Sequence, residues 1–131
     1  MAFNLSSLAV KDTTLLQLRH PETDELLWAD DEQTKPVGIH IFGKSSKEYR
    51  NAFNARMNRQ FKRGKQTLSA EKLQEENIEM LVACSDKAEN LELDGKTFTT
   101  SEDFRSLYIN PAFDWIKTQV DAGIEDVGSF L

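Results

Sequence analysis

The hydrophobic pattern changes its period at Gly43, and this change limits the folds that are open to the chain. Before Gly43, the run 37–42 alternates Val37, Ile39 and Ile41 with other side chains. After it, large apolar side chains recur at every fourth position, at Tyr49, Phe53, Met57 and Phe61. A two-residue period is typical of a half-buried strand, and a recurrence at four residues is typical of a helix. The sequence therefore predicts an α+β fold in which a small sheet precedes the helices.

The segment before Gly43 predicts a small N-terminal antiparallel sheet or hairpin. Three short apolar runs are the candidate strands, at residues 13–19, 25–29 and 37–42. The first break, 20–24, contains proline, threonine and aspartate, which are residues that favour turns. Because the breaks are short, consecutive strands are expected to pair in antiparallel fashion.

The segment after Gly43 predicts a bundle of about four helices. Ser45 and Glu48 have the spacing of a capping box, and Gly64 supplies a helix stop. The second helix has an apolar face that includes Leu73, Asn77 and Leu81, and it is expected to be the central helix. The predicted helices run from about Ser45 to Arg63, from Ser69 to about Glu89, from Thr100 or Ser101 to Asn110, and from Phe113 towards Gly123, where the pattern loosens.

The length of 131 residues is that of one ordinary domain, and no repeat or linker divides it. We therefore expect a single domain over residues 1–131, with residues 1–12 as a flexible arm. The N-terminal residues lack the features of a secretory signal, and no run approaches the roughly 20 apolar residues of a membrane-spanning helix. These patterns predict a protein of the cytoplasm.

Residues 47–65 form a basic island in an acidic chain. The segment has seven basic residues and one acidic residue, Glu48, whereas the whole chain has a formal net charge of −6. Such a face suits an acidic protein surface, nucleic acid, or simple solvation. Because the aromatic residues of this helix share one face with Met57, they are expected to pack in the core and not to stack on bases. Protein contact or solvation is therefore favoured, with a small nucleic-acid-binding or regulatory accessory protein as the alternative.

No motif for catalysis, cofactor binding or metal binding emerges from the sequence. Cys84 lies in an apolar run and is expected to pack as a small hydrophobic residue. His20 and His40 have no second ligand at the spacing of a metal site. The remaining motifs lack the spacing of a calcium loop or a phosphate loop: Asp30-Asp31-Glu32, Asp94-Gly95 and Gly43-Lys44-Ser45. We therefore assign no catalytic, cofactor or metal residue and expect no enzyme.

The candidate residues for protein interaction are chosen by charge and by exposed apolar surface. The chosen arginines are expected on an exposed face of the basic helix, and the chain ends on two large apolar residues. The candidates are Trp28, Arg56, Arg59, Arg63, Phe130 and Leu131.

Three segments resemble a known family. They are the helix start "SSKEYR" at 45–50, the segment "DGKTFTTSEDFRSLY" at 94–108, and "NPAFDWI" at 110–116. Together with the order of strand, basic helix, acidic helix and apolar terminus, they cover residues 36–131. In these features the chain resembles the tail assembly chaperones of long-tailed, lambda-like (siphovirus-type) bacteriophages.

The resemblance implies a protein that binds other proteins stoichiometrically in the host cell cytoplasm. Such a chaperone multimerises into rings or spirals and coats the tape measure protein during tail morphogenesis, and the mature virion lacks it. The resemblance further implies a longer product of the same gene, made by ribosomal frameshifting, as a partner. The tail tube protein is a further candidate partner, and no cofactor is implied.

Overall fold

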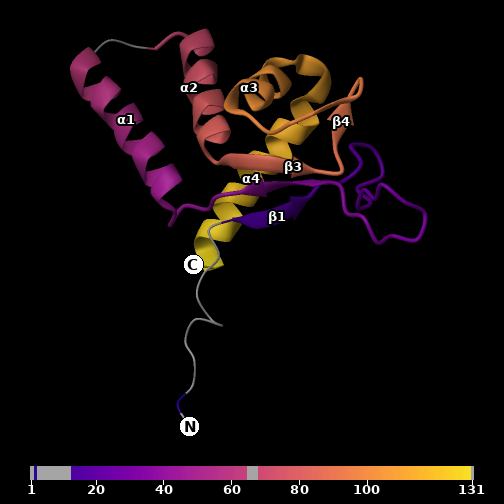
Figure 1. The fold of residues 1–131 in the computed structure, drawn as a ribbon. Helices are drawn as coiled ribbons and strands as arrows, with labels where there is room; N and C mark the ends of the chain where they lie inside the picture. The colour runs from indigo at the N-terminus through magenta and orange to yellow at the C-terminus, as the bar shows by residue number, and fades with distance from the viewer. Residues whose placement is uncertain (1, 3–12, 65–67, 131) are drawn as a thin grey trace.

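The computed structural model describes residue 2, residues 13–64 and residues 68–130, with the side chains of residues 127–130 excepted. It confirms the predicted α+β fold class, in which a small antiparallel sheet is combined with four α-helices (Figure 1). Apart from Ala2, the predicted arm 1–12 lies outside the described residues. The elements are β1 (Thr14–Gln17), β2 (Gly38–Ile41), α1 (Lys47–Arg63), α2 (Ala70–Ala83), β3 (Ser85–Glu89), β4 (Glu92–Leu93), β5 (Lys96–Thr97), α3 (Ser101–Ile109), the 3₁₀ turn η2 (Pro111–Phe113) and α4 (Asp114–Phe130).

The main sheet is antiparallel, in the order β1-β2-β3. Ile39 in the middle strand pairs with Leu16 of β1 and with Ala88 of β3. The predicted strand at 25–29 is wrong, because this segment makes only isolated bridges, Arg19 with Leu26 and Trp28 with Pro36. The third strand of the sheet, β3, therefore follows α1 and α2 in the sequence and does not come from the N-terminal segment.

The end of the second helix also differs from the prediction. We expected it near Glu89, but α2 ends at Ala83 and residues 85–89 form β3. Residues 85–89 pair with the edge of β2 that β1 leaves open, and this pairing supplies hydrogen-bond partners for the backbone of both strands. The stabilisation from this pairing outweighs the local preference of these residues for a helix. Ser85, the first residue of β3, also hydrogen-bonds to Tyr108 of α3, with 2.6 Å between the two hydroxyl oxygens.

The predicted starts of the four helices, and the predicted end of α1, are close to those observed. The cap of α1 is Ser46 and not Ser45, because the Oγ of Ser46 accepts a hydrogen bond from the backbone N–H of Tyr49 at 3.0 Å. Gly64 ends α1 with a φ of +64°, which favours glycine. Ser69 caps α2, and Thr100 forms a capping box with Asp103 at the start of α3.

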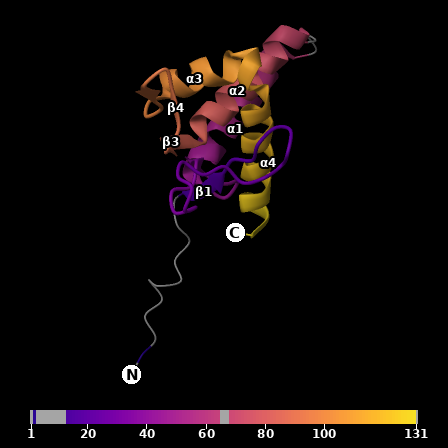
Figure 2. The same cartoon turned by 90° about the vertical axis from the view of Figure 1, so that its right-hand side faces the viewer.

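Helix α4 continues through Gly123, where we expected the pattern to loosen. A Cβ atom at this position would lie 3.0 Å from both terminal methyl groups of Leu16 and 3.2 Å from a methyl group of Ile41. The missing side chain therefore lets the helix approach β1 and β2 closely. Figure 2 shows α4 running along one side of the molecule.

The hydrophobic core lies between the sheet and helices α2, α3 and α4. Helix α4 contacts β1 and β2, whereas α2 and α3 contact β3. As predicted, α2 is central, since it also contacts α1, α3 and α4. The largest fully buried side chains are Tyr108, Phe104, Leu18, Ile39, Ile41, Val120 and Cys84.

Candidate protein-interaction surface

Helix α1 stands apart from the core and packs mainly against α2 (Figure 1). None of its residues is buried. The prediction that its aromatic residues pack in the core holds for Tyr49, which packs against it, but is wrong for Phe53, which is 42% exposed, and for Phe61, which is 82% exposed. This helix therefore presents large apolar side chains to solvent.

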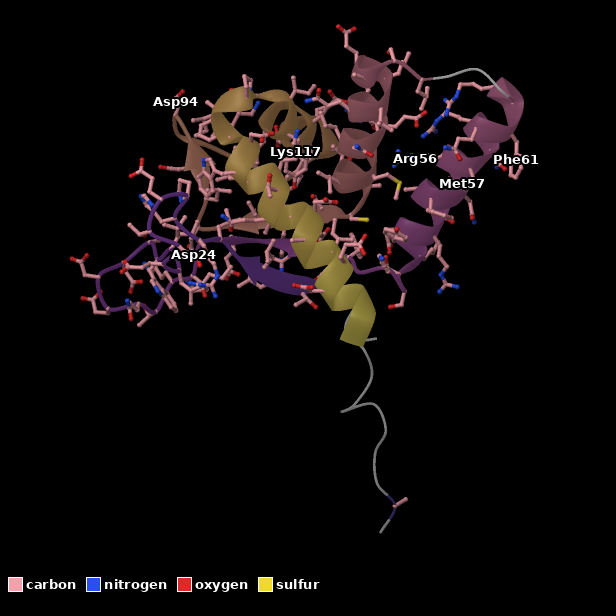
Figure 3. All side chains as sticks on the ribbon, turned by 180° about the vertical axis from the view of Figure 1, so that it is seen from behind. Asp24, Arg56, Met57, Phe61, Asp94 and Lys117 are labelled. Carbon is pink, nitrogen blue, oxygen red and sulfur yellow. The ribbon has the colours of Figure 1, made fainter. Side chains whose placement is uncertain are left out.

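The exposed residues belong to an aromatic stripe, which we define as Tyr49, Phe53, Met57 and Phe61. A step of four residues advances roughly 40° around a helix, so the stripe turns from the body of the molecule towards solvent. Tyr49 packs against the core, and its ring stacks on that of Phe53 with 6.1 Å between the centroids. At the other end, Phe61 points away from α2 (Figure 3).

Three arginines occupy the face of α1 that turns towards α2, and all three contact Glu76. The nearest atoms are Nη1 of Arg63, at 2.8 Å from Oε1 of Glu76. Nε of Arg56 lies 3.4 Å from Oε2, and Nε of Arg59 lies 3.6 Å from Oε1. We call this arrangement the Glu76 clasp. It joins α1 to α2 by charge where a helix pair usually has apolar contacts.

The clasp keeps its carboxylate ionised. Glu76 is only 7% exposed, and burial alone would favour its neutral form. The hydrogen bond from Arg63 has the largest effect and lowers the pKa of Glu76, and the charges of Arg63, Arg56 and Arg59 lower it further. Three guanidinium groups of α1 thus share this one carboxylate of α2.

A groove lies between α1 and α4, with α2 as its floor; Figure 3 views the molecule from this side. A hollow of about 380 Å³ between α2 and α4 is lined by Leu73, Asn77 and Asp121, among others. A smaller hollow of about 120 Å³ shares Asn77 and Asp121 and reaches Tyr49 of α1. We call the two adjoining hollows the α2 groove.

The groove explains why the predicted apolar face of α2 is only partly buried. Leu81 and Cys84 of that face are in the core, but Leu73 is 44% exposed and Asn77 is exposed. Ile78 and Val82, which lie beside that face, are also buried. The α2 groove thus borders the core at Leu81 and Cys84 and is open to solvent at Leu73 and Asn77.

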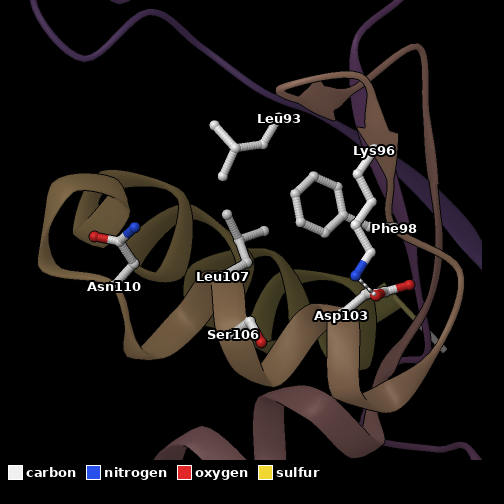
Figure 4. Close-up of a pocket in the computed structure, with 7 residues that line it drawn as sticks. All are labelled: Leu93, Lys96, Phe98, Asp103, Ser106, Leu107 and Asn110. Carbon is white, nitrogen blue, oxygen red and sulfur yellow. Dashed lines mark ion pairs between the residues drawn. The ribbon is translucent and has the colours of Figure 1, made fainter.

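A separate pocket of about 190 Å³ lies between the β4–β5 hairpin and α3 (Figure 4). Its apolar lining includes Phe98 and Leu107, and at its edge Lys96 Nζ lies 3.5 Å from Oδ1 of Asp103. Asp103 accepts hydrogen bonds from the backbone N–H groups of Thr99 and Thr100, and the bond from Thr99 has the largest effect in lowering its pKa. The carboxylate thus serves the helix cap, and the pocket is smaller than the roughly 300 Å³ at which ligand sites begin.

The structure brings together only the three arginines among the predicted interaction residues. Arg56 and Arg63 are half-buried, so the expectation that both lie on an exposed face is wrong; Arg59 is exposed. Trp28 is half-buried and lies in the loop segment 18–37, across the molecule from α1 (Figure 1). Phe130 ends α4, but its side chain and the whole of Leu131 lie outside the described residues.

Sequence reasoning missed Glu76, the residue on which the three arginines converge. A signal was present, because Arg56, Arg59 and Arg63 have the spacing i, i+3 and i+7 and must share one helical face. Three positive charges on one helical face predict an acidic residue on the helix that packs against that face. Four glutamates of α2 could have filled that role, so the choice of Glu76 required the structure.

The other titratable side chains fit structural roles. The thiol of Cys84 is buried, and burial raises its pKa to about 12, in line with the predicted packing role. Nδ1 of His20 accepts hydrogen bonds from the backbone of Glu22 and Thr23, and Nε2 of His40 lies 3.2 Å from Glu89. Within residues 13–64 and 68–130, no group of three or more His, Cys, Asp and Glu side chains is placed to hold a metal ion.

Comparisons with protein-family models, with curated proteins and with solved structures found no match to this chain. Among the described helices, none has the length and apolar character needed to cross a membrane.

Proposed function

We propose that the protein is a phage tail assembly chaperone that multimerises and binds the tape measure protein during tail morphogenesis. The observation that carries this proposal is the aromatic stripe of α1, whose apolar side chains turn away from the core. Exposed apolar groups of this size on an ordered helix are typical of a surface that a partner covers. The resemblance in residues 36–131 supplies the identity of the partner.

The physical character of α1 suits a stoichiometric coat on a long helical partner. A helix presents its side chains in ridges, and a stripe with a four-residue spacing is the ridge that fits between the ridges of another helix. Repeated copies of such a surface can cover an apolar stripe along a filamentous protein. The basic surroundings add attraction to an acidic partner and speed its encounter.

The alternative function, binding of nucleic acid through residues 47–65, has weaker support. Three of the basic residues, Arg56, Arg59 and Arg63, already face Glu76. A phosphate backbone would have to compete with that carboxylate. If the alternative held, DNA or RNA would bind with an affinity that falls steeply as salt rises. We expect no such binding in a salt titration at physiological ionic strength.

The proposal is tested by coexpression with the tape measure protein from the same genome. We expect the two proteins to copurify. Phe53→Ser combined with Phe61→Ser should reduce the recovered complex by about tenfold or more, since these side chains supply exposed apolar contacts. The matched control is Leu26→Ser, because Leu26 is 40% exposed and lies in the loop segment far from α1. Failure of the wild-type chain to copurify would contradict the proposal.

A further inference from the structure

We infer that the outer edge of β1 binds residues 3–10 of a second copy of this chain as an added strand. This inference rests on the proposed function only in assigning a surface to the multimerisation, and it does not involve the tape measure protein. Three observations carry it: an open strand edge, an uncharged segment that closely precedes β1, and a connection between the two that is unsuited to a hairpin within one chain.

The strands β1 and β3 form the two edges of the main sheet, and only β3 has a backbone partner on its outer side. The backbone N–H of Ala88 in β3 donates a hydrogen bond to the carbonyl oxygen of Phe98 at 3.0 Å. By contrast, no backbone hydrogen bond joins the outer edge of β1 to another segment within residues 13–64 and 68–130. Figure 1 shows β1 as the outermost strand of the sheet.

The ladder between β1 and β2 shows which backbone groups face outwards. Leu18 continues the register of β1, and its N–H donates to the carbonyl oxygen of Val37 at 2.9 Å. Because residues along an antiparallel pair face the partner strand alternately, Leu16 directs its backbone groups towards β2, whereas Leu15 and Gln17 direct theirs away from it. Each of these two residues therefore offers one N–H donor and one C=O acceptor at the open edge.

The next outward-facing residue, Arg19, shows how such groups can be satisfied. The side-chain amide of Gln119 in α4 accepts a hydrogen bond from the N–H of Arg19 at 2.8 Å and donates one to its carbonyl oxygen at 2.9 Å. These are the two bonds that a residue of a neighbouring strand would make. Gln119 thus closes the edge at Arg19, and an added strand has the edge up to Gln17 to pair with.

The edge and the segment before it both lack charge. Charged side chains and proline are common means by which proteins protect an open edge from pairing. Residues 13–18 contain neither, and residues 3–10 contain neither, in a chain of which 29% is charged. The second segment also has two pairs of apolar residues with the two-residue spacing of a strand: Phe3 with Leu5, and Leu8 with Val10. No charge on either side opposes the pairing.

The connection between this segment and β1 favours a second copy over the same chain. Only Lys11 and Asp12 separate Val10 from Thr13. Tight hairpin loops need positive φ angles and favour glycine, and the first glycine of the chain is Gly38. A segment that reaches a neighbouring copy needs no such turn. Because each copy offers one edge and one segment, the contact can repeat from copy to copy and build a ring or a spiral.

The inference is tested by cross-linking two differently tagged forms of the chain with a short bismaleimide. One form carries Ser7→Cys, and the other carries Thr14→Cys at an exposed position of β1. Cys84 is buried and its pKa is raised to about 12, so it should not react. We expect a product that contains both tags. Glu92→Cys, at an exposed position of β4, is the matched control for Thr14→Cys and should give at least about tenfold less product.

Leu15→Pro tests the edge itself. Proline removes the N–H that points outwards and leaves the ladder between β1 and β2 in place, and edge strands tolerate proline at such positions. We expect multimers to require a roughly tenfold higher concentration of this variant, as light scattering over a concentration series measures. Circular dichroism melting checks that the variant is folded.

Substitutions within residues 3–10 test the segment without changing β1. Leu5→Lys combined with Leu8→Lys should also raise the concentration needed for multimers by about tenfold, because the apolar contacts are lost and charge opposes the pairing. The matched control is Ser6→Lys combined with Ser7→Lys, which adds the same charge and keeps the apolar side chains. Its effect should be smaller, at most about threefold.

Three results would overturn the inference. They are a cross-link that forms only within a single chain carrying both cysteines, equal cross-linking of Ser7→Cys to Thr14→Cys and to Glu92→Cys, and unchanged assembly of both the Leu15→Pro chain and the doubly substituted leucine chain. The first of these would assign residues 3–10 to the edge of their own chain.

Copurification with the tape measure protein separates failure of this inference from failure of the proposed function. If the wild-type chain copurifies with the tape measure protein but gives no product with both tags, the function stands and the assignment of the β1 edge falls. If the product with both tags forms but the tape measure protein never copurifies, the proposed function falls and the assignment remains.

Discussion

At the scale of single residues, Glu76 decides how α1 is held. Its two carboxylate oxygens face three guanidinium groups, and only the bond from Arg63 has hydrogen-bond geometry. Oε2 is buried and accepts no hydrogen bond within the described residues, although Nε of Arg56 lies 3.4 Å away. Removing the charge would leave the arginines facing a neutral group in a partly buried place.

We predict that Glu76→Gln loosens α1 without unfolding the core. A hydrogen bond to a charged group in such a place contributes about 2 kcal/mol, which corresponds to roughly a 30-fold change in opening. Amide hydrogen exchange in α1 should accelerate by about this factor, while exchange in β2 should stay unchanged. Glu75→Gln is the matched control, because Glu75 is exposed and pairs with Lys72, also exposed, at 3.5 Å. Equal effects of the two variants would refute the clasp.

The clasp should also respond to pH. The pKa of Glu76 is lowered in the folded protein below its ordinary value of 4.5, so its stabilising effect is complete above 4.5 and is lost as pH falls through the lowered value. The difference in α1 exchange between the wild type and Glu76→Gln should be full at pH 7, should begin to shrink below pH 4.5, and should disappear once the pH has fallen through the lowered pKa of Glu76. A difference that persists unchanged in strong acid would show that the charge of Glu76 is not its source.

At the scale of elements, α1 is the helix that depends least on burial. It contributes no buried residue, whereas α2, α3 and α4 all contribute to the core. Local opening is easiest where few apolar contacts must be broken. The sequence predicted the bounds of α1 well, because the serine cap, the glycine stop and the four-residue hydrophobic period all indicate the same helix. It did not predict the orientation, because a stripe at helical spacing looks the same whether it faces a core or a partner.

We predict that trypsin cleaves α1 before it cleaves the other helices. Its sites at Arg56, Arg59 and Arg63 become accessible when α1 opens, and that opening does not require the core to unfold. Mass spectrometry of a time course should detect cuts after these residues earlier than cuts after Arg105 or Lys117. First cleavage after Arg105 or Lys117 would contradict the view that α1 is attached mainly through the clasp.

The sheet shows where local sequence and tertiary structure disagree. Residues 85–89 are polar and carry little strand preference, and Cys84 and Ala88 fit the helical face of α2. Their strand conformation comes from pairing with β2, a contact between segments more than 40 residues apart. Patterns within one segment do not encode such pairing. By contrast, β1 and β2 alternate and were predicted to within two residues.

Gly38 offers a direct test of this packing. A Cβ atom there would lie 2.3 Å from the backbone oxygen of Leu16, so Gly38→Ala should force β1 and β2 apart and destabilise the protein by about 3 kcal/mol or more. Gly95→Ala is the control, since its added Cβ meets open space and its φ of +81° costs only about 1 kcal/mol. Urea unfolding should rank the two variants in this order. A reversed order would refute the close approach.

At the scale of the whole molecule, the sequence predicted the fold class but only part of the candidate surface. The change of period at Gly43 was enough to place a sheet before a group of helices. The convergence of Arg56, Arg59 and Arg63 followed from their spacing, but their common target did not. The α2 groove could not be predicted from the sequence. It forms only when α1, α2 and α4 are placed next to one another, and the pattern within each segment does not specify that placement.

The central claim is that many copies of this chain cover one elongated partner. The most direct measurement is the mass of the complex with the tape measure protein, obtained by light scattering coupled to size exclusion. The account predicts a complex that contains several copies of the chain for each tape measure protein, and a chain that multimerises on its own as its concentration rises. A strict monomer at all concentrations, together with a complex of one copy to one or no complex, would contradict it.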